Sequence, residues 1–208
     1  RLYEGLMGEY YDWYENKTDE SSSLTVQFSK LMKVRQVIAE EKIKDTIELA
    51  ENIIEQGKKV IIFTNFTDTL HKITEHFGKI AVSLDGSTSK PARQFAVDQF
   101  QENEKIKVFV GNLKAAGVGL TLTAAEAVIM NDLSFVPSDH SQAEDRAFRY
   151  GQKNNVSVYY PIFENTIEGA IYDILIKKKN IFETVMGDNL LDKGDFIEEV
   201  MNRINKRG

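Results

Sequence analysis

The sequence predicts an α/β fold in which a mostly parallel central sheet is flanked by helices, with helical extensions at both ends of the chain. Short β-branched and apolar runs alternate with stretches whose apolar residues recur at helical spacing, an alternation typical of parallel sheets. The run Val60–Phe63 contains only apolar residues, as expected of a strand buried on both faces. Because parallel sheets bind ligands at the carboxyl ends of their strands, we expect the functional residues in the loops that follow the strands.

The first part of the chain predicts helices. Apolar residues at helical spacing indicate a short helix over 2–10, a second over 24–38 and a third over 43–54. Gly57 is a natural stop for the third helix. Residues 1–40 are therefore expected to form a helical extension that leads into the main domain.

Strands and helices then alternate. The predicted strands are 60–63, 80–84, 107–110, 127–130 and 156–160. The predicted helices of this part are 67–77 (with Thr67 or Asp68 as the cap), 91–100, 142–150 and 167–179. A last helix is predicted within 189–208. We expect one main domain at 41–186 and a C-terminal helical tail at 187–208.

Composition limits the class of protein. The 208 residues are 42% hydrophobic and 28% charged, which is ordinary for a folded domain. The net charge of −6 speaks against a wholly basic surface but leaves room for a local basic cleft. The absence of cysteine excludes disulfides and thiolate metal sites, which fits an intracellular protein. Without an apolar run of about 18 residues or a visible signal peptide, no membrane association is expected, and the chain looks like a piece of something longer.

The stretch from Gln142 to Gln152, QAEDRAFRYGQ, is the most informative part of the sequence. On a helix, one face would carry Gln142, Asp145, Arg146 and Arg149. Two arginines one turn apart would form a rigid cationic fork, and planar guanidinium groups suit phosphate oxygens. A solvated helix face with ordinary ion pairs is the alternative. The loops around this helix favour the phosphate interpretation.

Three of these loops follow predicted strands. Gly117–Gly119 either lets the backbone approach a phosphate or ribose closely or forms a tight turn, and both interpretations are open. Thr64 and Asn65 offer hydroxyl, amide and N–H groups of the kind that hold a sugar-phosphate chain without reading bases. The turn Asp85–Ser89, with Arg93 in the next helix, invites the same interpretation. Ordinary turn chemistry is the alternative at both places.

Other chemistry is not indicated. The sequence contains no G-x-x-x-x-G-K-[ST] phosphate loop and no pair of strand-end acids that we would assign to magnesium. The three histidines share no ligand spacing, so a metal site is not expected. The aromatic residues expected in the core are Phe95, Phe100, Phe163 and Tyr172.

Taken together, five blocks over about residues 58–179 resemble the second RecA-like lobe of the Swi/Snf-type ATPases within superfamily 2 helicases. In order they read IIFTNFTDTL, LDGSTSKPARQFAVDQF, VFVGNLKAAGVGLTLTAAEAVIMND, QAEDRAFRYGQ and VYYPIFENTIEGAIYDILIKKK. The Q-x-x-D-R-x-x-R-x-G-Q block carries most of the resemblance. Within this block, the sequence QAEDR is most similar to the HepA-related, annealing-helicase branch.

The resemblance implies an ATP-driven motor that translocates on double-stranded DNA. ATP with Mg²⁺ would lie between two lobes, held mainly by an N-terminal RecA-like lobe that is not in this chain, so the chain alone is expected to be inactive. Arg146 and Arg149 would be arginine fingers, with Gln142 and Asp145 orienting their helix. The ATP-facing loop would contain Gly117, Val118 and Gly119. The residues implied to contact the DNA backbone are Thr64, Asn65, Arg93, Asn112 and Lys114.

Two alternatives stay open at this point. The chain could be a non-catalytic nucleic-acid or protein-binding module derived from a helicase lobe. It could also belong to an RNA-directed superfamily 2 helicase, which the D-R-x-x-R-x-G-Q motif disfavours. In each case we expect an intracellular protein, in the cytoplasm or nucleoid if the source is prokaryotic or viral.

Overall fold

The computed structural model describes residues 2–16, 24–116, 119–135, 137–148, 152, 155–182, 198–200 and 202–203. The chain divides into two compact units. One consists of residues 41–161, and the other of residues 1–40 and 162–208. None of the described helices combines the length and apolar character that crossing a membrane requires.

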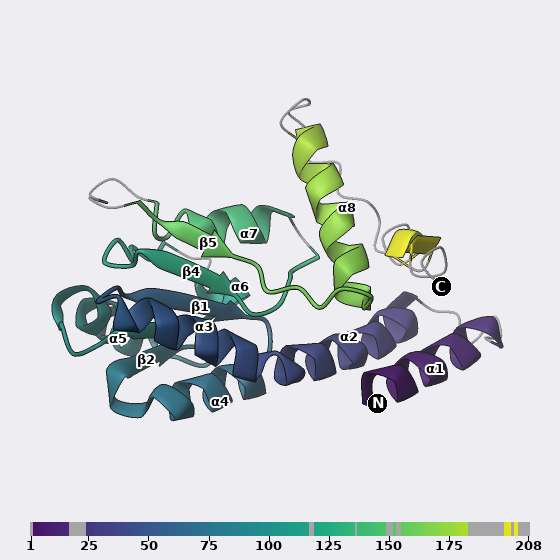
Figure 1. The fold of residues 1–208 in the computed structure, drawn as a ribbon, viewed down its shortest axis with the longest axis horizontal. Coiled ribbons are helices and arrows are strands. Elements are labelled where there is room, and N and C mark those ends of the chain that lie inside the picture. The colour runs from purple at the N-terminus through teal and green to yellow at the C-terminus, as the bar shows by residue number, and fades with distance from the viewer. Residues whose placement is uncertain are drawn as a thin grey trace. The chain divides into compact units, whose positions relative to one another are not determined.

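The first unit is built on a five-stranded sheet in which all strands are parallel (Figure 1). The strands are β1 (Val60–Thr64), β2 (Ala81–Leu84), β3 (Val108–Asn112), β4 (Ala127–Met130) and β5 (Ser157–Tyr159). Their order across the sheet is β2-β3-β1-β4-β5. The predicted fold class is confirmed, and all five strands lie where the sequence predicts them to within a few residues.

The register brings the carboxyl ends of the three central strands level with one another. Thr64, the last residue of β1, pairs with Asn112, the last residue of β3. On the other side of β1, Phe63 pairs with Met130, the last residue of β4. The loops after β1, β3 and β4 therefore begin beside each other, although they are far apart in the sequence.

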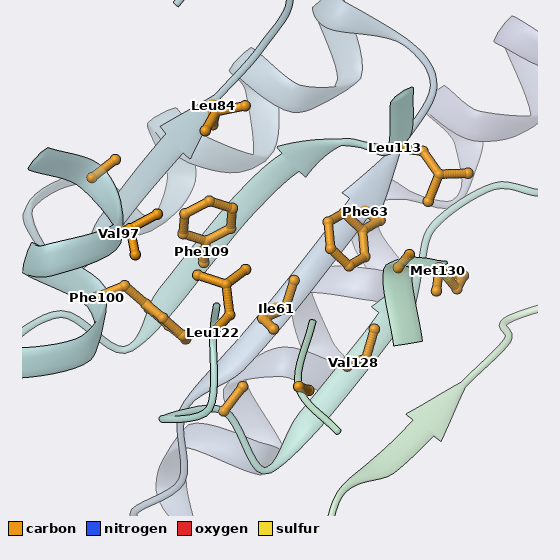
Figure 2. Packing of buried hydrophobic residues seen from close by; sticks show 14 of the residues in the cluster. Ile61, Phe63, Leu84, Val97, Phe100, Phe109, Leu113, Leu122, Val128 and Met130 are labelled. Carbon is orange, nitrogen blue, oxygen red and sulfur yellow. The ribbon is translucent and has the colours of Figure 1, made fainter. Parts of the chain in front are cut away.

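Helices cover both faces of this sheet. Along β1, Ile61 and Phe63 pack into a cluster on one face, whereas Val60 and Ile62 pack into a cluster on the other. The first cluster includes Val97 and Phe100 of α5 (Lys90–Glu102) (Figure 2). It also includes Ala143 of α7 (Pro137–Glu144). The second cluster is covered by α3 (Ile43–Glu55) and α4 (Thr67–Phe77). The 3₁₀ turn η1 (Gly78–Ile80) precedes β2, and α6 (Leu113–Ala116) follows β3.

The structure differs from the predictions at three positions in this unit. The N-cap residue of α4 is Phe66, not Thr67 or Asp68, and its backbone N donates to Thr64 Oγ1 at 3.2 Å. A short helix, α6, lies in the predicted loop after β3. Phe95 is 64% exposed rather than in the core, because the buried stripe of α5 runs along Ala96, Val97 and Phe100.

The second unit contains α1 (Leu2–Glu15), most of α2 (Leu24–Glu41) and α8 (Ile167–Phe182). The N-terminus of α8 is held by α1, since the backbone N of Ile167 donates to Tyr3 Oη at 2.8 Å. In the same turn, Phe163 N donates to Glu168 Oε2 at 3.2 Å, so a carboxylate lies in the first turn of α8, where negative charge is favourable. The helix predicted within 189–208 lies largely outside the described residues.

Candidate functional site

A buried carboxylate lies at the carboxyl edge of the sheet. Asp132, two residues after β4, is only 3% exposed. Its Oδ2 accepts a hydrogen bond from Thr64 Oγ1 at 2.5 Å, and its Oδ1 accepts one from Asn65 Nδ2 at 2.6 Å. The backbone N of Asn65 lies 3.1 Å from both carboxylate oxygens. A carboxylate is costly to bury unless donors satisfy it, and here two consecutive residues supply three donor groups.

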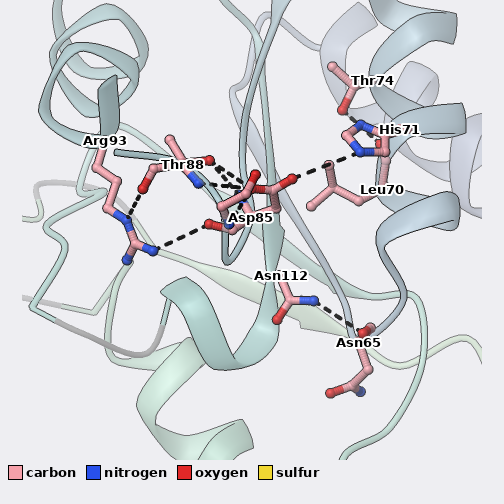
Figure 3. Close-up of polar contacts among 9 residues, drawn as sticks. Asn65, Leu70, His71, Thr74, Asp85, Thr88, Arg93 and Asn112 are labelled. Carbon is pink, nitrogen blue, oxygen red and sulfur yellow. Dashed lines mark hydrogen bonds and ion pairs between the residues drawn. The ribbon is translucent and has the colours of Figure 1, made fainter. Parts of the chain in front are cut away.

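Asn65 is also held from the opposite side. Asn112 Nδ2 donates to the carbonyl oxygen of Asn65 at 3.1 Å (Figure 3), and Asn112 Oδ1 accepts from the backbone N of Lys114 at 3.2 Å. Hydrogen bonds thus connect the ends of β4, β1 and β3 into one network. The structure brings together four of the five residues that the sequence assigns to DNA, namely Thr64, Asn65, Asn112 and Lys114.

Direct contact between DNA and the Thr64 side chain is not compatible with this arrangement. Thr64 is fully buried, and its hydroxyl donates to Asp132. The reason is its place at the end of β1, the central strand, where neighbours on both sides enclose it. Asn65 and Asn112 are half-buried and Lys114 is exposed. These three residues are therefore the accessible members of the group.

Arg93, the fifth of these residues, braces the turn after β2 (Figure 3). Its Nε donates to the Thr88 carbonyl at 2.9 Å and its Nη2 to the Asp85 carbonyl at 3.3 Å. In the same turn, Asp85 Oδ1 accepts from Ser87 Oγ at 2.7 Å and from the backbone N atoms of Ser87 and Thr88. These donors, the Ser87 hydroxyl first, hold the pKa of Asp85 below its usual value. The hydrogen bonds of an ordinary turn, the alternative that the sequence left open at Asp85–Ser89, are therefore present here.

The two-arginine segment differs from the predicted helix. The helix α7 ends at Glu144, and Asp145–Ala147 form a turn, so Gln142, Asp145 and Arg146 do not share one continuous helix face. Arg146 N donates to Ala143 O at 3.2 Å and Ala147 N to Glu144 O at 3.1 Å, three-residue bonds that tighten the end of the helix. Gln142 and Asp145 are exposed.

Arg146 itself is a buried brace for a neighbouring loop. It is only 6% exposed, and its Nη1 donates to the Leu120 carbonyl at 3.4 Å. Its own carbonyl accepts from Leu122 N at 2.9 Å. Gly119, which begins the described part of this loop, is exposed and has a φ of +68°. The predicted site residues Gly117, Val118 and Arg149 lie outside the described residues.

A buried histidine supports the start of α7. His140 is 7% exposed, and its Nε2 accepts from the backbone N of Ser134 at 3.0 Å. Ser134 Oγ donates to Asp139 Oδ2 at 2.5 Å, so the loop after β4 is tied to α7 twice. Burial lowers the pKa of His140 and favours its neutral form. In the described ranges, no three His, Asp or Glu side chains gather where they could hold a metal ion.

Sequence reasoning did not single out Asp132 or His140. A usable signal existed for Asp132, because this carboxylate lies two residues after the wholly apolar strand β4, at the edge of the sheet that binds ligands. No comparable local signal existed for His140, whose burial depends on packing between the loop and α7.

Comparison with known proteins identifies the class. Residues 41–151, more than half of the chain, match the family described as helicase conserved C-terminal domain, and the chain belongs to this family. ATP-dependent helicase fft3 of Schizosaccharomyces pombe is 38% identical over 150 residues, which cover 71% of this chain and 16% of that protein.

Two solved structures specify the class further. The C-terminal part of the Fun30 ATPase domain shares 31% identity with a TM-score of 0.66, over 80% of this chain and 53% of that one. The Sulfolobus solfataricus SWI2/SNF2 ATPase core in complex with dsDNA shares 26% identity with a TM-score of 0.77, over 99% of this chain and 46% of that one. The chain is therefore the C-terminal RecA-like lobe of a Swi/Snf-type ATPase. It spans less than a quarter of the length of fft3, and the HepA-related branch stays a prediction.

Proposed function

We propose that this chain is the second motor lobe of an ATP-dependent translocase of the Swi/Snf type that moves on double-stranded DNA. It works with an N-terminal RecA-like lobe that carries the phosphate loop and the ligands of Mg²⁺. The main support is the extent of the structural likeness, since 99% of the chain aligns with half of a SWI2/SNF2 core described in complex with dsDNA.

On the ATP side, we assign Arg146 and Arg149 as the groups that stabilise charge on the transferring phosphoryl group. Guanidinium groups supplied across a cleft can be worth about a thousandfold or more in rate. In this structure Arg146 is 6% exposed and its Nη1 donates to the Leu120 carbonyl, so this assignment requires its guanidinium to move away from that loop toward the phosphate. The exposed Gly119 presents backbone without a side chain beside it, which suits close approach of a phosphate or ribose. Gln142 and Asp145 orient the segment that carries both arginines.

On the DNA side, we assign Asn65, Asn112 and Lys114 to the sugar-phosphate backbone. Amide N–H groups and an ammonium group hold phosphates but carry no sequence information, which suits a motor that moves over any sequence. Arg93 is a fourth candidate, although two of its nitrogens donate to carbonyls of its own turn.

Arg149→Ala in the full-length protein tests the ATP-side assignment. ATP hydrolysis should be lost, because the developing phosphoryl charge is no longer neutralised, while duplex DNA binding is retained. Lys105→Ala is the matched control, since Lys105 is an exposed cation in the loop before β3, at the opposite edge of the sheet. Unchanged turnover in the Arg149 variant would remove the proposed role for that residue.

Two further measurements separate the proposal from its alternatives. ATP turnover by this chain alone, at the rate of the full-length protein, would contradict the need for an N-terminal lobe. Stimulation of the full-length protein by duplex DNA and not by RNA supports the translocase. Duplex binding without any turnover would instead indicate a non-catalytic module, and stimulation by RNA alone an RNA helicase.

A further inference from the structure

We propose that Asp132 is a positioning residue, which fixes Asn65 in the orientation that contacts the DNA backbone. The inference rests on the proposed function, because it concerns the same DNA-facing edge of the sheet. It gives Asp132, two residues after β4, a role in DNA binding that does not require its side chain to touch DNA.

The geometry places Asn65 between two neighbouring strand ends. Asp132, 67 residues away in the sequence, binds the backbone N and the side-chain Nδ2 of Asn65. Asn112, 47 residues away, binds the carbonyl oxygen from the other side. Three polar groups of Asn65 are thus fixed, which restricts both its backbone and its side chain. Because Nδ2 carries two hydrogens, one is left for a phosphate oxygen when the other is given to Asp132.

The chemistry of the contact requires a carboxylate. The groups that Asp132 meets from Thr64 and Asn65 all donate to it, so an acceptor-only side chain is needed. Asparagine has the same shape, but it would turn an NH₂ group toward one of these donors. Asp132→Asn therefore disturbs the orientation of Asn65 without opening a cavity.

Thr64 takes part in the same arrangement. Its buried hydroxyl donates to Asp132 Oδ2 and accepts from Phe66 N, so it connects the carboxylate to the backbone on the far side of Asn65. Thr64→Val removes this connection and leaves Asp132 intact. The two variants thus disturb the orientation of one residue from two directions.

A purely structural role for Asp132 is the competing explanation, and the chain offers a matched control. Thr46 Oγ1 donates to Asn131 Oδ1 at 2.7 Å in a buried contact one residue from Asp132. Thr46→Val removes a buried hydrogen bond at the same strand end but leaves Asn65 untouched. If loss of buried hydrogen bonding were the whole effect, the Thr46 and Asp132 variants would behave alike.

The experiment measures ATP hydrolysis by the full-length protein against the concentration of a blunt DNA duplex, together with thermal unfolding. Asp132→Asn should raise the half-saturating duplex concentration about tenfold, equivalent to about 1.4 kcal/mol, and keep the wild-type rate at saturating DNA. Thr64→Val should shift it in the same direction by a smaller factor. Thr46→Val should lower the melting temperature but keep the wild-type half-saturating concentration.

Three outcomes would overturn the inference. The first is an Asp132→Asn variant with the half-saturating duplex concentration of the wild type. The second is a rise in that concentration in Thr46→Val equal to the rise in Asp132→Asn. The third applies if Asp132→Asn does not fold, and is a Thr64→Val variant whose half-saturating duplex concentration equals that of the wild type. Failure of the proposed function looks different, because the wild-type protein itself would then show no stimulation by duplex DNA.

Discussion

Replacing Gly119 by alanine tests the loop that we place beside ATP. The backbone there has a φ of +68°, a left-handed conformation that residues with a Cβ rarely adopt. Outside the adjacent residues of the chain, no heavy atom of the described residues lies within 4 Å of the position that the new Cβ would take. The substitution therefore changes the backbone preference and introduces no clash within the described part of the chain.

The expected size of the effect follows from two opposing contributions. A left-handed conformation costs an L-residue about 1–2 kcal/mol, whereas alanine restricts the unfolded chain and returns about 0.4–1 kcal/mol. We expect Gly119→Ala to lower the free energy of unfolding by about 1 kcal/mol, a shift of about 2–4 °C in melting temperature for a chain of this size.

Urea and thermal denaturation of the 208-residue chain measure this effect. Gly86→Ala is the control, since Gly86 is an exposed turn glycine without a positive φ, and its Cβ would also meet no described atom within 4 Å outside the adjacent residues. Asparagine tolerates the left-handed region, so Gly119→Asn should recover stability. A Gly119→Ala variant as stable as the wild type would refute the reasoning.

The same pair of variants addresses nucleotide binding in the full-length protein. If ATP approaches the backbone of Gly119 closely, Gly119→Asn should raise the half-saturating ATP concentration more than Gly119→Ala does, although it is the more stable variant. If the glycine only supports a tight turn, ATP affinity should instead follow stability. This measurement separates the two interpretations that the sequence leaves open.

Two further predictions concern the packing around the site. Burial lowers the pKa of His140 from its usual 6.5, so below that pH the unfolded chain binds more protons at this residue than the folded chain does. The free energy of unfolding should therefore fall as the pH drops toward the folded-state pKa, and it should fall less in His140→Gln. A wild-type free energy of unfolding that does not change with pH over this range would contradict the prediction. Phe100 is fully buried, and its ring centroid lies 5.6 Å from that of Phe109 and 5.4 Å from Lys59 Nζ. Phe100→Ala should lower the free energy of unfolding, measured in urea, by about 3–5 kcal/mol. A loss below about 1 kcal/mol would show that the cluster collapses around the cavity.

Much of the fold could be predicted because its signals are local. A continuous apolar run such as Val60–Phe63 is typical of a strand buried on both faces, and the structure shows it fully buried in β1. The helices flanking the sheet follow from apolar spacing in the same way. The family could be predicted because the block 142–152 keeps its residue types at fixed spacing, independently of how that segment folds.

Local signals were less informative at the ends of elements. The spacing of Gln142, Asp145 and Arg146 predicts one helix face, but α7 ends at Glu144 because contacts with the loop at Leu120–Leu122 compete with further helical turns. Phe95 is apolar and on a helix, yet it lies outside the stripe that α5 turns toward the sheet.

By itself, the sequence determined the class of fold, the positions of the strands and the membership of the helicase C-terminal family. Only the tertiary structure decided which strand ends lie side by side, and with them the contact between Asp132 and Asn65, 67 residues apart. Strand order depends on how the helices pack against the whole sheet, and no short stretch of sequence encodes it. The burial of Thr64 and the role we propose for Asp132 follow from that order.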